Sequence, residues 1–191
     1  MKDTRMTTFS LHTVQSAPDA AKPMLEQAEK EYGFLPNLYR NMSEAPELLE
    51  SYRTLSGIFG NTSFTETERQ VILLTNNRLN GCEYCMAAHT TISQGAGVPD
   101  PIIEALRNGH SIADVKLEAL RKFAAVINET RGYPTADDIS GFLAAGYTKQ
   151  NVLEVLVGTS LKVLSNYTNH ITHTPLDEAF VSNTWTASDV D

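Results

Sequence analysis

The two cysteines of this 191-residue chain, Cys82 and Cys85, stand three residues apart, and His89 follows one helical turn later. If the segment is helical from Cys82, these three side chains share one face, because residues three and four apart are neighbours on a helix. Helical spacing separates the two Cα atoms by about 5 to 6 Å, which a disulfide tolerates. The motif therefore predicts a pair of thiols that can cycle between the reduced state and a disulfide.

The start of the predicted helix favours ionisation of a thiol. Unpaired backbone N–H groups and the positive end of the helix dipole stabilise an anion there, and they lower the pKa of a cysteine from about 8.5. The thiolate is the nucleophilic form, and His89 is expected to accept the proton of Cys85, directly or through a water molecule. Glu83 lies off this face and is expected to act electrostatically on the first turn. Tyr84 is expected to donate a hydrogen bond or to pack.

A series of amphipathic helices must position this motif. Apolar residues recur at helical spacing from about residue 17 onward, and no segment has the period-two alternation of a strand. Thr65 and Glu68 form a capping-box pattern before one helix, and Gly81 separates that helix from the one that carries the cysteines. We expect helices at about 18–32, 37–42, 47–59, 66–80, 82–94, 101–108, 113–130 and 149–168, with another that starts at Thr135.

These helices predict an all-α fold, a single-domain helical bundle over residues 16–182, with an N-terminal extension at 1–15 and a short acidic tail at 183–191. The tail is expected to be mobile or bound to a partner. The last long helix is apolar almost all round, which is typical of a helix buried in the domain or in a subunit contact. We therefore expect a homo-oligomer, as a dimer, a trimer or a hexamer.

The composition excludes several classes of function. With 15 Lys and Arg against 23 Asp and Glu, the formal charge is −8, which opposes the electrostatic attraction that dominates binding to nucleic acids. The longest apolar run, 123–127, has five residues, whereas a membrane-spanning helix needs roughly 20. The N-terminal residues have no signal-peptide pattern. We expect a cytoplasmic protein that binds neither nucleic acid nor a membrane.

The segment from Gly81 to His89, together with the helical pattern from about residue 18 to residue 180, resembles the AhpD-like (alkylhydroperoxidase D) branch of the carboxymuconolactone decarboxylase superfamily, in particular its peroxidase-related subset. The resemblance implies an all-helical, oligomeric fold. It also implies that Cys85 attacks a peroxide, that Cys82 resolves the resulting sulfenic acid, and that His89 assists proton transfer.

The chain departs from this family at two positions. AhpD itself has a glutamate twelve residues before the first cysteine, where this chain has Gln70, and a histidine between the cysteines, where it has Tyr84. Gln70 cannot shuttle a proton and is expected to make a structural hydrogen bond near the site. Glu68 is a candidate substitute for the missing glutamate, but it is two residues out of register and already completes the capping box.

We therefore predict a peroxidase that reduces hydroperoxides through a Cys82–Cys85 dithiol/disulfide cycle without a metal or another cofactor. An external dithiol, from a reductant protein or a lipoyl-type donor, is expected to reopen the disulfide at the more exposed sulfur, which we assign to Cys82. Leu73, Leu74 and Met86 are expected to line an apolar pocket for the substrate.

Three other functions fit parts of the sequence. Cys82, Cys85 and His89 offer three zinc ligands, and His170 or His173, in a polar cluster near the C-terminus, could supply a fourth. These two histidines could also approach the cysteine site without a metal. The branch that names the superfamily decarboxylates a lactone. A helical oligomer without turnover could use its thiols as a passive redox sensor.

Overall fold

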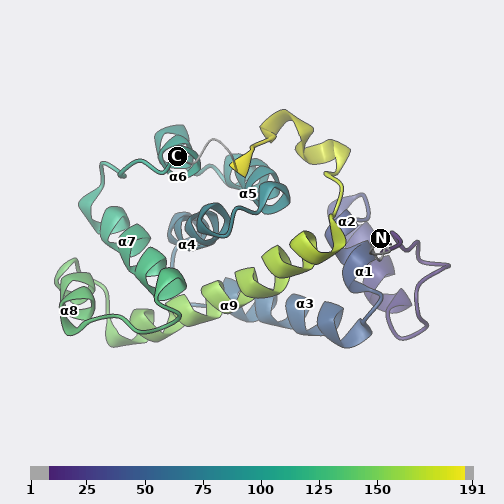
Figure 1. The fold of residues 1–191 in the computed structure, drawn as a ribbon, viewed down its shortest axis with the longest axis horizontal. Helices are drawn as coiled ribbons and strands as arrows, with labels where there is room; N and C mark the ends of the chain where they lie inside the picture. Colours follow the sequence, from purple (N-terminus) through teal and green to yellow (C-terminus); the bar gives the residue numbers. More distant parts are fainter. Residues whose placement is uncertain (1–8, 188–191) are drawn as a thin grey trace, which may run out of the picture.

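The computed structural model describes residues 9–187, and over this range the chain is a single helical domain without a β-strand (Figure 1). The all-α fold predicted from the periodicity is confirmed, and none of the helices in this range is long and apolar enough to cross a membrane. The elements are α1 (Lys22–Tyr32), α2 (Asn37–Met42), α3 (Pro46–Gly60), α4 (Glu66–Leu79), α5 (Glu83–Gly95), α6 (Asp100–Asn108), α7 (Val115–Glu129), α8 (Ala136–Ala144), α9 (Lys149–Thr172) and the 3₁₀ helix η1 (Glu178–Asn183).

Capping side chains explain why several helices begin where the sequence predicts. Thr65 and Glu68 form the expected capping box, in which the Thr65 hydroxyl accepts the Glu68 amide at 3.3 Å and the Glu68 carboxylate accepts the Thr65 amide at 2.8 Å. Thr135 and Thr148 cap α8 and α9 with boxes of the same kind. These local bonds satisfy backbone donors that the first turn of a helix leaves without partners.

Two predicted boundaries are wrong by about one turn. Helix α1 begins at Lys22 rather than at residue 18, because the residues before it form hydrogen-bonded turns, with the Ala21 amide 2.9 Å from the Pro18 carbonyl oxygen. Helix α9 continues to Thr172 rather than to residue 168, and it ends where His173 adopts the left-handed conformation at φ 48°. The extra turn of α9 matters because it carries a side chain that contacts both thiols.

Helix α4 lies at the centre of the domain and packs against α5, α6, α7 and α9. In Figure 1, α9 runs along the length of the molecule beside α3, with α7 and α8 toward one end and α1 and α2 toward the other. After α9 the chain turns back, and η1 packs on α5. The first turn of α5, which carries the cysteines, is therefore enclosed by several elements that are distant in the sequence.

The last helix is buried on one side only. Val155 and Leu161 lie in the core, whereas Leu153, Leu156 and Ile171 are 66%, 40% and 64% exposed. The sequence pattern predicted that this helix is buried in the domain or in a subunit contact. The inner side of the helix is buried within the domain. The outer side presents an apolar surface of the kind that buries against a partner.

The segment after α9 packs against the domain. The Trp185 side chain is buried and its indole N–H donates to the Arg107 carbonyl oxygen at 3.1 Å. The Asn183 amide donates to Thr91 Oγ1 at 3.0 Å, and the Ala187 amide donates to the Glu83 carboxylate at 3.1 Å. The prediction of a mobile tail is therefore wrong for residues 183–187, because an indole and several polar groups fix them to α5 and α6.

The N-terminal extension also makes contacts with the domain where it is described. The Arg40 guanidinium of α2 donates to the His12 carbonyl oxygen at 2.7 Å, and the His12 ring bonds to the Glu44 carboxylate at 2.7 Å. Residues 1–8 of the predicted extension and residues 188–191 of the predicted tail lie outside the described residues.

Close packing at Gly158 generates a stability prediction. A Cβ atom at Gly158 would lie 2.8 Å from Ile72 Cγ2 and 2.8 Å from Phe59 Cε2, so Gly158→Ala overpacks the contact of α9 with α3 and α4. We expect a loss of about 1 to 3 kcal/mol in the free energy of unfolding, measured by urea denaturation. Gly57→Ala in α3 is the matched control, since a Cβ there meets nothing within 4 Å. That variant is expected to gain about 0.5 to 1 kcal/mol, and equal effects of the two substitutions would contradict the packing argument.

Candidate functional site

The two cysteines flank the start of α5. Gly81 adopts the left-handed conformation at φ 64° and reverses the chain after α4. Cys82 is the residue before the helix, in an extended conformation, and its carbonyl oxygen accepts the Met86 amide at 2.9 Å. Cys85 lies in the first turn of the helix. The helix begins one residue later than predicted, but the expected placement of both thiols at its N-terminus holds.

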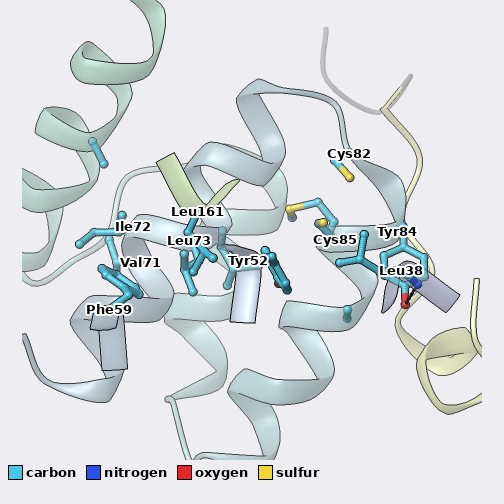
Figure 2. Close-up of a cluster of buried hydrophobic side chains, with 14 of the residues drawn as sticks. Leu38, Tyr52, Phe59, Val71, Ile72, Leu73, Cys82, Tyr84, Cys85 and Leu161 are labelled. Carbon is cyan, nitrogen blue, oxygen red and sulfur yellow. Dashed lines mark hydrogen bonds between the residues drawn. The ribbon is translucent and has the colours of Figure 1, made fainter. Parts of the chain in front are cut away.

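Both thiols are reduced and buried. Cys82 is 1% exposed and Cys85 is 2% exposed, so the prediction that Cys82 carries the more exposed sulfur is wrong for the free thiols. The Asn169 side-chain amide of α9 donates to Cys85 Sγ at 3.1 Å and to Cys82 Sγ at 3.7 Å. Figure 2 shows the two cysteine side chains close together at one end of the hydrophobic cluster, next to Tyr84 and Leu38. One amide group thus spans both sulfurs.

The two thiols differ in acidity. Burial alone would raise the pKa of Cys85, but a hydrogen bond from Cys82, the positive charge of Lys162 and hydrogen bonds from α9 outweigh it and lower the pKa to about 5. The hydrogen bond that Cys82 gives to Cys85, together with burial, raises the pKa of Cys82. At neutral pH the pair therefore carries a single negative charge, and Cys85 holds it.

Lys162 is the unexpected member of the site. Lys162 belongs to α9 and its side chain is completely buried. Its ammonium group donates to His89 Nε2 at 3.0 Å. Among the described residues, the ion pairs do not include a carboxylate partner for Lys162. A buried ammonium group without an anion is strongly destabilising. Cys85 lines the same cavity as Lys162 and its pKa is lowered by that charge, so its thiolate is the candidate anion.

His89 contacts Lys162 and Gln70. Burial and the charge of Lys162 hold the pKa of His89 well below its usual value, so the ring is neutral. Because Nε2 accepts from Lys162, the proton is on Nδ1, which donates to the Gln70 carbonyl oxygen at 3.0 Å. Gln70 in turn donates to the Glu66 carboxylate at 2.8 Å. Gln70 therefore makes a structural hydrogen bond near the site, as expected from the sequence. This bond fixes the tautomer of His89.

A chain of asparagines joins the helices beneath the thiols. Asn77 of α4 donates to the Cys85 carbonyl oxygen at 3.1 Å, and Asn166 of α9 donates to Asn77 at 3.0 Å. Asn80 donates to Asn166 at 2.8 Å, and Asn128 of α7 donates to Asn80 at 3.1 Å. Such a network holds α4, α5, α7 and α9 in one register, because each amide is satisfied only when its neighbours are in place.

Sequence reasoning missed the contribution of α9. Lys162, Ser165, Asn166 and Asn169 are all buried and recur at the i, i+3, i+4, i+7 spacing of one helix face. A polar stripe of this kind, set within an otherwise apolar helix, was the available signal. It indicates that the inner face of α9 meets polar groups on a facing helix.

Two other predicted site residues, Tyr84 and Glu68, make their hydrogen bonds and ion pairs with groups other than the thiols. The Tyr84 hydroxyl donates to the Asp177 carboxylate at 2.5 Å and accepts the Leu38 amide at 3.3 Å, which ties α5 to α2 and to the C-terminal segment. Glu68 caps α4 and pairs with Lys116 at 3.2 Å. Its partners are therefore structural groups rather than the thiols.

Two cavities adjoin the thiols. A cavity of about 300 Å³ is lined by Cys85, His89 and Lys162 together with the aromatic side chains of Tyr32, Phe34, Tyr39, Tyr52, Tyr84 and Phe180. A second cavity of about 290 Å³ is lined by Cys82 and by polar residues that include Asn169, His170 and His173. The two histidines therefore do approach the cysteine pair, on the side of Cys82. A larger cavity, of about 480 Å³, lies between α7 and α8 and is lined by neither thiol.

The residues predicted to line the substrate pocket are wrong for the cavity next to Cys85. Leu73, Leu74 and Met86 are not among the residues that line the cavity next to Cys85; their side chains are buried in the hydrophobic core instead. The walls come instead from α1, α2, α3 and the C-terminal segment. Periodicity could not supply those residues, since they meet at the site only through the tertiary fold.

The zinc alternative finds no support in the geometry. Within residues 9–187, no group of three His, Cys, Asp or Glu side chains is arranged to hold a metal ion. His89 is bonded to Lys162 and Gln70 through its two ring nitrogens, and an amide donor from Asn169 contacts both sulfurs. Both ring nitrogens of His89 are therefore already occupied by other partners.

Comparisons with known proteins agree with this geometry. The family model described as the carboxymuconolactone decarboxylase family matches residues 44–129. No curated protein matches the chain. The fold is similar to that of an uncharacterized peroxidase-related protein with an alkylhydroperoxidase AhpD core from Ralstonia eutropha JMP134, at a TM-score of 0.80 and 17% identity, over 92% of this chain and 94% of that one.

Two further solved structures share the fold. A peroxidase-related protein from Silicibacter sp. TM1040 has a TM-score of 0.78 and 17% identity, over 94% of this chain and 96% of that one. The debrominase Bmp8 in complex with 2,3,4-tribromopyrrole has a TM-score of 0.77 and 17% identity, over 95% of this chain and 97% of that one. At these identities the likeness is one of fold.

The pairing of Lys162 with Cys85 generates a prediction about acidity. In a Cys82→Ser background, where Cys85 is the single thiol, Lys162→Met is expected to raise the pKa of Cys85 by one unit or more, equivalent to about 1.4 kcal/mol per unit. The reason is the loss of the positive charge that favours the thiolate. The ultraviolet absorbance of the thiolate, followed against pH, measures the shift.

Lys122→Met is the matched control for this titration. Lys122 is an exposed lysine of α7 that pairs with Glu118 at 3.7 Å, so its removal is expected to leave the pKa of Cys85 unaltered. If Lys162→Met and Lys122→Met gave the same titration curve, the buried charge would not be the cause of the low pKa.

Proposed function

We propose that this chain is a thiol-dependent peroxidase, because residues 44–129 match the model of the carboxymuconolactone decarboxylase family and the chain has the AhpD-like fold. It reduces hydroperoxides through a Cys82–Cys85 dithiol/disulfide cycle. The observation that carries this proposal is the Cys85 sulfur itself, a buried thiol of lowered pKa that shares one amide donor with a second thiol and lines an aromatic cavity.

The first step is attack of the Cys85 thiolate on the distal peroxide oxygen. A sulfur–oxygen bond forms, the peroxide oxygen–oxygen bond breaks, and the two electrons come from sulfur, which becomes a sulfenic acid. The departing alkoxide needs a proton. Lys162 lines the same cavity and supplies it.

Proton transfer from Lys162 also keeps the site neutral. Before the reaction, the buried charges are the thiolate and the ammonium group. Formation of the neutral sulfenic acid would leave the ammonium group without an anion in a site of low dielectric constant. Loss of the proton from Lys162 removes that charge at the same stage. His89 acts as a positioning residue, since its Nε2 holds the ammonium group of Lys162 at 3.0 Å.

The second step closes the disulfide. The Cys82 sulfur attacks the sulfenic sulfur of Cys85, the new sulfur–sulfur bond replaces the sulfur–oxygen bond, and water leaves. An external dithiol, from a reductant protein or a lipoyl-type donor, returns both sulfurs to thiols and is itself oxidised to a disulfide. All redox chemistry in the cycle takes place at sulfur, so the proposal requires no resident metal or organic cofactor.

A second candidate function is reductive dehalogenation of a halogenated aromatic compound. The aromatic lining of the cavity next to Cys85 favours it, and the debrominase of similar fold binds a bromopyrrole. The reaction balances without another reductant: two thiols and an aryl bromide give a disulfide, the dehalogenated arene and hydrogen bromide. Lactone decarboxylation makes no use of a thiolate paired with a proton donor, whereas passive redox sensing would use the same thiolate without turnover.

The proposal includes the setting in which the protein works. A cytoplasmic location would keep the pair reduced between turnovers. We also propose a homo-oligomer built through the outer face of α9, where Leu153, Leu156 and Ile171 are exposed. Light scattering on the purified protein determines the number of subunits.

The peroxidase proposal predicts a defined change in the protein. One equivalent of an organic hydroperoxide is expected to consume both thiols of the reduced protein, with a mass decrease of about two daltons, because disulfide closure removes two hydrogen atoms. Thiol counting and intact-protein mass spectrometry measure the change. Thiols that survive hydroperoxide, but are lost with release of bromide on addition of 2,3,4-tribromopyrrole, would favour the second candidate.

Single substitutions assign the roles of the two sulfurs. Cys82→Ser is expected to accumulate a sulfenic acid on Cys85 that dimedone traps, because the resolving thiol is missing. Cys85→Ser is expected to be inert toward hydroperoxide, since it removes the sulfur that lines the aromatic cavity together with Lys162, a cavity that Cys82 does not line. Trapped sulfenic acid in Cys85→Ser, but none in Cys82→Ser, would reverse the assignment.

A further inference from the structure

The two thiols line different cavities. Cys85 lines the aromatic cavity with His89 and Lys162, whereas Cys82 lines the polar cavity with Asn169, His170 and His173. Neither cavity is lined by both sulfurs. Tyr84 is common to the two linings, and its hydroxyl is held by the Asp177 carboxylate and the Leu38 amide. A fixed side chain therefore lies between two approaches to one disulfide.

In thiol–disulfide exchange, the two sulfurs also differ in how readily each one leaves. When a thiolate attacks a disulfide, the sulfur that leaves most readily is the one whose thiol has the lower pKa. In this pair that thiol is Cys85, whose pKa is lowered while that of Cys82 is raised. The departing Cys85 thiolate also regains its ionic partner, since Lys162, left neutral by the peroxide step, takes up the proton that the first reductant thiol releases. The productive attack is consequently on the Cys82 sulfur, which adjoins the polar cavity.

We propose that the hydroperoxide and the reductant reach the site through separate cavities: the hydroperoxide through the aromatic cavity to Cys85, and a dithiol through the cavity beside His170 to Cys82. This inference rests on the proposed dithiol cycle. In the exchange step, the reductant thiolate bonds to Cys82 Sγ and the Cys82–Cys85 bond breaks. The second thiol of the reductant then attacks the mixed disulfide, and Cys82 leaves as a thiolate that takes up a proton.

The shape and chemistry of the polar cavity indicate the kind of reductant. Cys82 is 1% exposed, so a reductant sulfur must enter the cavity to reach it. The cavity measures about 290 Å³ and is lined by polar groups that include Thr174, His170 and Glu83. A polar dithiol suits these walls, whereas the aromatic cavity suits an apolar hydroperoxide.

Separate access has a functional consequence. The alcohol product can still occupy the aromatic cavity while the disulfide is reduced, since the reductant does not use that path. Reduction is then independent of product release. A shared entrance would instead make the product a competitor of the reductant.

A matched pair of tryptophan substitutions tests the two paths. His170→Trp adds bulk at an exposed position beside the polar cavity, and Ile92→Trp adds it at a position 45% exposed beside the aromatic cavity. Two rates are measured for each variant: oxidation of the thiols by cumene hydroperoxide, and reduction by dithiothreitol of the disulfide formed with diamide. The ratio of reduction to oxidation is expected to fall at least tenfold in His170→Trp and to rise at least tenfold in Ile92→Trp.

The same ratio in both variants would overturn the inference, and so would a change of opposite sign. His170→Ala separates bulk from loss of the imidazole, since it removes the ring without obstructing the cavity. A ratio that falls as far in His170→Ala as in His170→Trp would also count against the steric path. Thermal unfolding of each variant identifies any that fails to fold, and the wild-type measurement below does not depend on them.

The wild-type protein provides an independent measurement. Cumyl alcohol at a concentration that slows oxidation by cumene hydroperoxide is expected to leave the rate of dithiothreitol reduction unaltered. Competitive inhibition of the reduction would show one shared entrance. Because diamide forms the disulfide in this assay, reduction can be followed even if hydroperoxide does not oxidise the protein. Failure of the peroxidase proposal is therefore distinguishable from failure of separate access.

Discussion

The charge on Lys162 is the constraint on which the site depends. An ammonium group buried among helices needs an anion, and the carboxylates that pair with other cations of the described chain do not serve it. The Cys85 thiolate meets this need, and the thiolate in turn needs the ammonium group to remain ionised in the core. Each buried charge is stabilised by the opposite one. In the proposed reaction, Cys85 is the nucleophile and Lys162 is the proton donor.

The helices hold this pair in a site that excludes most of the solvent. Helix α5 supplies the sulfur, α9 supplies the ammonium group and the Asn169 amide, and α4 supplies the asparagines and Gln70 that fix their orientation. In a region of low dielectric constant, the attraction between the charges is stronger than it would be at the surface. The segment after α9, fixed by Tyr84 and by the buried Trp185, completes the enclosure.

The two departures from the resembled family have a physical explanation in this arrangement. Gln70, in the position of a glutamate, is a neutral acceptor that holds His89 through Nδ1, and this leaves Nε2 to accept from Lys162. Tyr84, in the position of a histidine, anchors the N-terminal end of α2 and the C-terminal segment. Neither residue carries a proton to sulfur. The acid that we propose for the site, Lys162, comes from a different helix, α9.

The sequence by itself determined the helices and the position of the thiols. Capping boxes such as that of Thr65, the glycine at Gly81 and the apolar spacing act over a few residues, so the boundaries of α2 and α4 and the start of α8 could be predicted from local pattern. The C-x-x-C-x-x-x-H motif is equally local. The family resemblance that followed from it is supported by the fold.

Only the tertiary structure decided what surrounds the thiols. Lys162 and Asn169 lie more than seventy residues from the cysteines in the sequence, and no local pattern specifies which helix face they meet. The same holds for the aromatic walls of the cavity beside Cys85 and for the packing of Trp185, which overturned the expected mobile tail. The physical reason is that electrostatic pairing, burial and cavity shape arise between segments that approach one another only after folding. Helix propensity and thiol spacing are already present in the chain before it folds.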